Sequence, residues 1–139
     1  GFDLGFIYDI SEELAFSMVI NDLFSTHLAY SDLPSEVIKG SLTLGAGYKP
    51  STSLKLAADI RGLEFADLIS ATFFTKLHLG AEYSPHKAMA LRAGLYQGYP
   101  TFGFGLLKFL NYAYYTRELG HYPGQIPETM HMLSLSLGF

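Results

Sequence analysis

The chain has 139 residues, of which 49% are hydrophobic, 15% are aromatic and 16% are charged, against roughly 25% charged residues in an average soluble domain. This length suits a single domain, and a formal net charge of -4 argues against the basic surface that nucleic-acid binding requires. No cysteine is present, which excludes disulfides, thiolate zinc sites and cysteine nucleophiles. Uninterrupted apolar runs are only a few residues long, so no segment suits a membrane-spanning helix of roughly 20 residues.

Apolar residues alternate with small, polar or charged residues in nine short segments, and this period of two predicts β-strands. In chain order the predicted strands are 2–10, 14–21, 41–48, 54–61, 76–83, 89–96, 101–106, 111–117 and 133–139. No position on the apolar side of these segments carries a charge. The pattern therefore predicts an all-β chain in which each strand has one apolar and one polar face.

The connections between these strands alternate in length. Short turns are predicted at 11–13, 49–53, 84–87 and around 108, and longer links at 25–36, 62–75 and 119–129, with a tighter link at 97–100. Short turns on one rim and longer loops on the other are typical of outer-membrane barrels.

A repeat supports this division into hairpins. The motif Leu-Gly-x-x-Tyr occurs three times, each time just before a short turn, and ends at Tyr8, Tyr48 and Tyr83. Its glycines, Gly5, Gly45 and Gly80, fall on the polar face, and its tyrosines fall on the apolar face. A tyrosine at that rim can bury its ring in hydrocarbon while its hydroxyl reaches water, so we expect these three to form an aromatic girdle.

Alternation alone does not separate a membrane barrel from a soluble β-sandwich, since a sandwich turns its apolar faces inward. Three features favour the barrel. The polar face is rich in Gly, Ser and Thr with isolated charges, the apolar face relies on Leu, Phe and Ala with only Val19 and Val37 as valines, and the chain stops at an aromatic residue. We therefore predict an antiparallel up-and-down transmembrane β-barrel, with a soluble β-sandwich binding module as an alternative.

Several segments resemble a known class of barrels. They are Thr75-Lys-Leu-His-Leu-Gly-Ala-Glu-Tyr, Leu91-Arg-Ala-Gly-Leu-Tyr-Gln-Gly-Tyr-Pro-Thr-Phe-Gly-Phe-Gly, Asn111-Tyr-Ala-Tyr-Tyr-Thr-Arg-Glu-Leu-Gly and Leu133-Ser-Leu-Ser-Leu-Gly-Phe. They look like the C-terminal part of PorV/PorQ-type and FadL-like outer-membrane barrels, including spirochaetal relatives. The resemblance implies a barrel of about 14 strands, and it makes Phe139 the signal read by the barrel-assembly machinery. These motifs belong to strand architecture and identify no active site.

Topology predicts that the nine strands are an incomplete barrel. If Phe139 ends at the periplasmic rim, counting back makes the first strand start at the outer rim without a partner, whereas bacterial single-chain barrels have an even number of strands. We therefore expect residues 1–139 to be the C-terminal portion of one barrel domain that lacks its N-terminal strands, about five of them by the resemblance.

The charged positions on the polar faces are the candidate lumen-lining residues: Lys55, Asp59, Arg61, Lys76, His78, Glu82, Arg92 and Arg117. Because neighbouring strands lie about 4.8 Å apart, opposite charges on them are expected to form ion pairs. Such a network can be structural, keeping the lumen open and the strands in register, or it can select solutes.

Metal and catalytic sites are not expected. The five histidines, at 27, 78, 86, 121 and 131, show no metal-ligand spacing, and only His78 falls on a polar strand face. A Gly-x-Ser-x-Gly elbow is missing, and no base or orienting acid is spaced to serve a serine. The sequence therefore predicts a chain that is not an enzyme and binds no cofactor or metal.

Two links stand out by composition. The link 62–75 is too apolar for an outer loop that serves only as a connection. It is either a site for a hydrophobic ligand or partner, or an extension of the flanking strands beyond the bilayer. The link 120–127 contains Pro123, Gly124 and Pro127, which predicts an irregular loop that caps the outer mouth.

The predicted location is the bacterial outer membrane, with the lipid bilayer and the barrel-assembly machinery as partners. The predicted function is the transport of hydrophobic or small solutes across that membrane. The alternative is a barrel that transports nothing and docks exported proteins or serves secretion, as the PorV resemblance implies.

Overall fold

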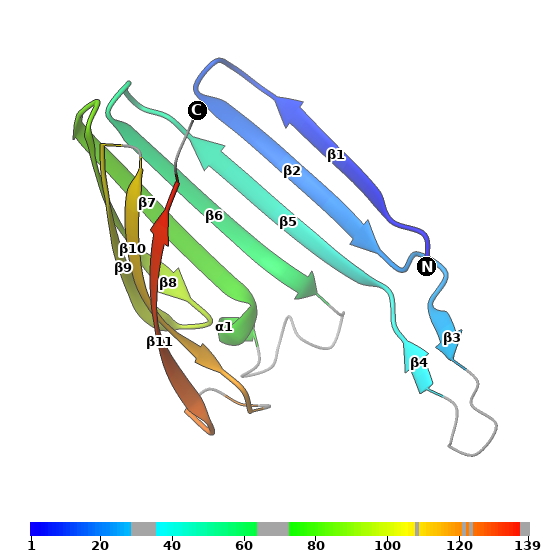
Figure 1. The fold of residues 1–139 in the computed structure, drawn as a ribbon. Coiled ribbons are helices and arrows are strands. Elements are labelled where there is room, and N and C mark those ends of the chain that lie inside the picture. Colours follow the sequence, from blue (N-terminus) through cyan, green and yellow to red (C-terminus); the bar gives the residue numbers. More distant parts are fainter. Residues whose placement is uncertain (29–35, 64–72, 108, 121, 123, 137–139) are drawn as a thin grey trace.

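The structure, a computed structural model, describes residues 1–28, 36–63, 73–107, 109–120, 122 and 124–136. Nine strands form one antiparallel sheet with the order β1-β2-β5-β6-β7-β8-β9-β10-β11, and β3 and β4 form a separate hairpin (Figure 1). The strands are β1 (Leu4–Asp9), β2 (Leu14–Asn21), β3 (Thr26–Leu28), β4 (Glu36–Ile38), β5 (Ser41–Tyr48), β6 (Leu54–Leu63), β7 (Leu77–His86), β8 (Met89–Tyr96), β9 (Tyr99–Leu106), β10 (Leu110–Glu118) and β11 (Pro127–Leu135). The prediction of nine strands in an up-and-down arrangement is confirmed.

Strand ends differ from the prediction where the alternation carries on through polar residues. The last strand begins at Pro127 instead of 133, because Thr129 and His131 continue the phase of the leucines that follow them. β7 runs through the predicted short turn to His86, with a register shift after Tyr83. The predicted link 97–100 is a two-residue turn of Gln97 (φ 52°) and Gly98 (φ 84°), a backbone geometry that suits tight hairpins.

The apolar link 62–75 lies partly outside the described residues. Its described ends are a short extension of β6 to Leu63 and a four-residue helix, α1 (Phe73–Lys76). The prediction that residue 76 starts a strand is wrong, because Lys76 ends this helix. Within the described part of the chain, no helix has the length and apolar character needed to cross a membrane.

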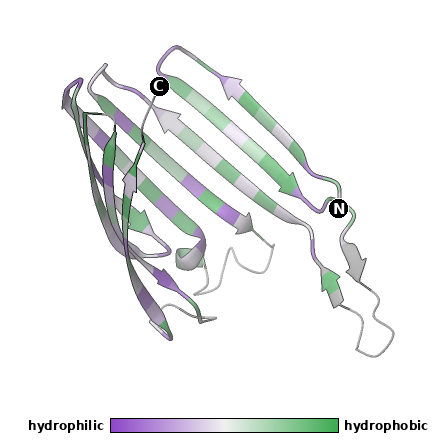
Figure 2. Ribbon diagram, viewed as in Figure 1, coloured by the Kyte–Doolittle hydropathy of each residue, from purple (hydrophilic) through white to green (hydrophobic). Residues whose placement is uncertain are grey.

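The sheet is a single curved layer with two different faces. Figure 1 shows it curling most tightly toward β8–β11, and Figure 2 shows hydrophobic and hydrophilic residues alternating along the strands. A cavity on the concave face is lined mainly by the polar phase, including Lys55, Asp59, Glu82 and Arg92. The apolar phase therefore lies on the convex face.

Large apolar side chains on the convex face are exposed. Phe6 is 52% exposed, Leu79 39% and Leu133 66%, and no hydrophobic residue among the described ones is buried. The described segments thus have no hydrophobic core between layers. They also supply no second sheet facing the apolar side, as a sandwich would.

The sheet is not closed in the described residues. β1 pairs only with β2, and β11 pairs only with β10, so both edge strands have one unpaired side. The sequence predicts nine strands of a larger barrel. The antiparallel nine-stranded sheet is seen, but its closure into a barrel is not seen among the described residues. β3 and β4 extend from the rim opposite the short turns and connect β2 to β5 (Figure 1).

Candidate functional site

Four residues on the concave face form a line of polar contacts across five strands, and we call it the charged row. Lys55 on β6 is in register with Glu82 on β7, which is in register with Arg92 on β8. Lys55 Nζ and Arg92 Nε each donate to a different oxygen of Glu82 at 2.8 Å. Arg92 also donates from a terminal guanidinium nitrogen to Asn111 Oδ1 on β10 at 3.2 Å. The cross-strand ion pairs expected from the sequence are therefore present at Glu82.

The last contact of this row passes over a whole strand. Arg92 and Asn111 lie on β8 and β10, which are separated by β9. The residues of β9 beneath them are Gly103 and Gly105, and a Cβ built on Gly105 would come within 2.8 Å of Asn111 Oδ1 and 3.4 Å of the Arg92 guanidinium. Because these two glycines have no side chain, the Arg92 guanidinium has the space to cross β9.

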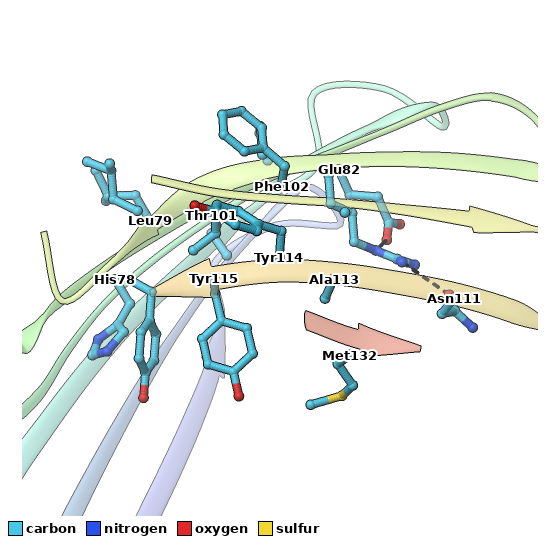
Figure 3. Close-up of a pocket in the computed structure, with 18 of the residues that line it drawn as sticks. His78, Leu79, Glu82, Thr101, Phe102, Asn111, Ala113, Tyr114, Tyr115 and Met132 are labelled. Atoms are coloured by element: carbon cyan, nitrogen blue, oxygen red, sulfur yellow. Dashed lines mark hydrogen bonds and ion pairs between the residues drawn. The ribbon is translucent and has the colours of Figure 1, made fainter. Parts of the chain in front are cut away.

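A second cluster lies four residues farther along the same strands, and we call it the aromatic cluster. It consists of His78 on β7, Tyr96 on β8 and Tyr115 on β10, whose ring centroids lie 4.8 Å (His78 to Tyr96) and 5.7 Å (Tyr96 to Tyr115) apart. Tyr115, like Asn111, meets its partner across β9. Figure 3 shows His78, Tyr115 and Met132 projecting from one side of the sheet, while Leu79 and Phe102 project from the other.

Asp59 on β6 lies close both to Arg61 on the same strand and to His78 of the aromatic cluster. It is in register with His78, and its carboxylate accepts from Arg61 Nε at 2.5 Å. His78 Nδ1 lies 3.4 Å from the same carboxylate, and among the described residues this buried nitrogen has no hydrogen bond. Asp59 therefore balances the charge of Arg61 and lies close to the imidazole.

A band of small side chains separates the charged row from the aromatic cluster. Ala57, Gly80, Gly94 and Thr101 are in register across β6 to β9, and all but Gly94 border a cavity of about 730 Å³. A Cβ built on Gly80 would meet nothing within 4 Å, so the floor is open there. A hollow with one charged and one aromatic wall can hold a small solute.

The remaining predicted lumen residues lie away from this hollow. Lys76, at the end of α1, donates from Nζ to the carbonyl of Gly62. Arg117 pairs with Glu128 at 2.6 Å, in register near the loop end of β10 and β11, and it does not line the cavity. The cavity brings together the other six predicted lumen residues, which are Lys55, Asp59, Arg61, His78, Glu82 and Arg92.

The three repeat tyrosines lie on the convex face and are exposed, Tyr8 by 70%, Tyr48 by 41% and Tyr83 by 49%. They are offset along the sheet. Tyr8 is in register with Phe16 and through it with Ala46, two residues before Tyr48. Tyr48 is in register through Leu56 with Ala81, two residues before Tyr83. Phe139, the predicted assembly signal, lies outside the described residues.

The other histidines are scattered. His27 is in β3, His86 ends β7 and accepts from the Ala88 amide at 3.2 Å, and His121 lies outside the described residues. His131 is on β11 beside Tyr112, whose hydroxyl lies 2.8 Å from its Nδ1. No group of three His, Asp or Glu side chains in the described segments could hold a metal ion.

Sequence reasoning missed Glu118, the last residue of β10. Its buried carboxylate accepts from Tyr99 Oη at 2.7 Å and from the backbone amides of Gly120 (2.8 Å), Gly124 (2.7 Å), Gln125 (3.2 Å) and Ile126 (2.6 Å). Burial raises the pKa of Glu118, but the hydrogen bonds from Tyr99 and the backbone outweigh it and lower this pKa from 4.5 to about 2. The sequence signal that could have identified Glu118 is an acidic residue directly before a glycine-containing loop. The carboxylate organises the link that was predicted to be irregular.

Comparison of the chain with protein-family models, with curated proteins and with solved structures gave no match. The resemblance to PorV-type and FadL-like barrels is therefore still a prediction from the quoted motifs.

Proposed function

We propose that this chain forms part of a closed β-barrel in the bacterial outer membrane and that small or hydrophobic solutes pass along its concave face. The observation that carries the proposal is the distribution of side chains on a single sheet. Apolar residues are exposed on the convex face from β1 to β11, while the charged row and the cavity lie on the concave face. A bilayer would cover the first face, and a hydrated lumen would suit the second.

The offset of the repeat tyrosines supports a barrel with tilted strands. A shift of two residues for every two strands corresponds to about 6.6 Å along the strands for every 9.6 Å across them. This ratio gives a strand tilt of about 35°, within the range of membrane barrels. At that tilt Tyr8, Tyr48 and Tyr83 lie at one height, as the aromatic girdle requires.

The two open edges call for further strands. Unpaired backbone groups of β1 and β11 cannot be left in hydrocarbon, so additional strands must pair with both edges to close the barrel. The resemblance to FadL-like barrels implies about 14 strands in all. The nine strands of the large sheet would then make up most of the wall.

One feature favours the alternative, a barrel that docks exported proteins. The β3–β4 hairpin extends past the sheet, and next to it Phe24 is 79% exposed and Leu23 42% (Figure 1). Exposed apolar side chains beyond the bilayer would suit contact with another protein. The hairpin itself is short, three residues in each strand.

Reconstitution of the full-length protein tests the proposal. A solute-conducting barrel should give single-channel conductance in planar bilayers and should admit small solutes into liposomes. A docking barrel should show neither activity and should instead co-purify with a secreted protein. If the full-length protein stays a compact monomer in water without detergent, the membrane proposal is wrong, and a soluble binding module takes its place.

A further inference from the structure

We infer that the hollow between the charged row and the aromatic cluster is a binding site for a small aromatic carboxylate. This inference rests on the proposed function, because it names the class of solute that would pause on the concave face. It is carried by three adjoining features: an excess of positive charge, a group of aromatic rings and an open floor between them.

The charged row supplies the anion-binding end. Lys55 and Arg92 share one carboxylate, and both oxygens of Glu82 are already hydrogen-bonded, so the row has one more positive than negative charge. The side chain of Lys55 is 55% exposed and that of Arg92 43%. Since the bond to Glu82 uses one of three donors on Lys55, donors are left for a second carboxylate.

The aromatic cluster supplies the other end. Tyr96 and Tyr115 contact each other edge to face, with interplanar angle 75°, and Met132 also lines the cavity. A planar ring can stack on or meet the edge of these tyrosines, and a thioether adapts its shape to a ring. An aliphatic chain would gain less from this geometry than a ring would.

The separation of the two ends limits the length of the ligand. Arg92 and Tyr96 are four residues apart on β8, which corresponds to about 13 Å along the strand. A hydrogen bond takes about 3 Å of this and a ring contact about 3.5 Å, which leaves about 6 to 7 Å for the molecule. A carboxylate on one or two fused rings has this length, and it would lie over Gly80.

Binding of 2-naphthoate to the full-length protein in detergent tests the inference, with fluorescence anisotropy as the measurement. The double variant Lys55→Gln with Arg92→Gln should weaken binding about tenfold or more, because both charged donors are lost. Lys49→Gln, which removes one charge from an exposed turn, should bind as the parent does. Binding of neutral 2-naphthamide or of octanoate as tightly as 2-naphthoate would overturn the inference.

A steric pair tests the site while leaving the ion pairs intact. Gly80 and Gly47 are two strands apart in the same band, and a Cβ at either position would meet nothing within 4 Å. Both positions therefore have room for an added Cβ. Gly80→Val should block the hollow and abolish 2-naphthoate binding, whereas Gly47→Val, outside the cavity, should not. Equal binding by the two variants would overturn the inference.

This measurement separates the site from the wider proposal. Conductance without 2-naphthoate binding would overturn the site and leave solute passage standing. Binding that is lost in Gly80→Val but occurs without conductance would support the site and overturn passage.

Discussion

Arg92 and Asn111 are hydrogen-bonded at 3.2 Å although they lie on strands that are not neighbours. The tyrosines at 96 and 115 meet in the same way across β9, with ring centroids 5.7 Å apart. Both contacts are made possible by small residues on the concave side of β9, Thr101, Gly103 and Gly105. The side chains of β8 and β10 therefore bridge β9 on the concave face where the sheet curls tightly (Figure 1).

Substitution of Gly94 should test how closely the strands approach at this bend. A Cβ on Gly94 would lie 2.2 Å from the carbonyl oxygen of Leu79, a backbone atom, so Gly94→Ala must displace a strand. We expect it to lower the free energy of unfolding by about 1 to 3 kcal/mol. Gly47→Ala, where the added Cβ meets nothing within 4 Å, should be close to neutral. Urea unfolding of both variants in lipid measures the difference, and equal midpoints would contradict the close approach.

In the proposed barrel, removal of the Glu82 charge should increase the preference for anions. The cavity is lined by three cations, Lys55, Arg61 and Arg92, against two carboxylates, Asp59 and Glu82. Glu82→Gln raises the excess from one positive charge to two, so the zero-current potential in a KCl gradient should shift by several millivolts or more toward the chloride equilibrium potential.

Glu128→Gln is the matched control for this measurement, because it removes a carboxylate that does not line the cavity. It should leave the potential nearly unchanged. A shift of the same size in both variants would show that the cavity charges do not set the selectivity.

The predictable part of this structure was its local alternation. Period two placed Lys55 and Glu82 on the same face of adjacent strands, and they are hydrogen-bonded at 2.8 Å. It also placed the described leucines and phenylalanines of the predicted strands on one face of the sheet. Such features depend only on the alternation of neighbouring residues and on which strands pair.

The other contacts depend on three-dimensional geometry, which the alternation of residues along the chain does not predict. The contact from Arg92 to Asn111 depends on sheet curvature, and the binding of a loop by Glu118 depends on where backbone amides point. Lys76 fits the strand phase but ends a helix. The last strand begins at Pro127, six residues before its predicted start, because polar residues such as His131 obscure the continuing period.

Acidification should loosen the loop after β10. The pKa of Glu118 is lowered from 4.5 to about 2, so its ionised form stabilises the folded loop at pH values above 4.5. This contribution is lost as the pH falls from 4.5 toward 2, when the carboxylate takes up a proton. Protection factors for the amides of Gly124 and Ile126 in hydrogen exchange should fall severalfold over that range.

Glu118→Gln should reproduce the low-pH behaviour at pH 6, because an amide lacks the charge that the surrounding donors stabilise. Glu12→Gln, in an exposed turn, should leave protection of the loop unchanged. Full protection in Glu118→Gln would contradict the role assigned to this carboxylate.

Leu79 on the convex face is 39% exposed. The effect of a charge at this position depends on whether the convex face contacts lipid or water. Leu79 lies four residues from Tyr83, about 11 Å above the girdle at a tilt of about 35°, near the middle of an apolar band of about 25 Å. In a bilayer, Leu79→Lys should cost about 2 to 4 kcal/mol of folding free energy, measured by urea unfolding in phospholipid vesicles. In water the same exposed substitution would change stability by about 0.5 kcal/mol or less. Ala57→Lys, whose side chain faces the cavity, should be tolerated in either case, so equal stability of the two variants in vesicles would rule out lipid contact at Leu79.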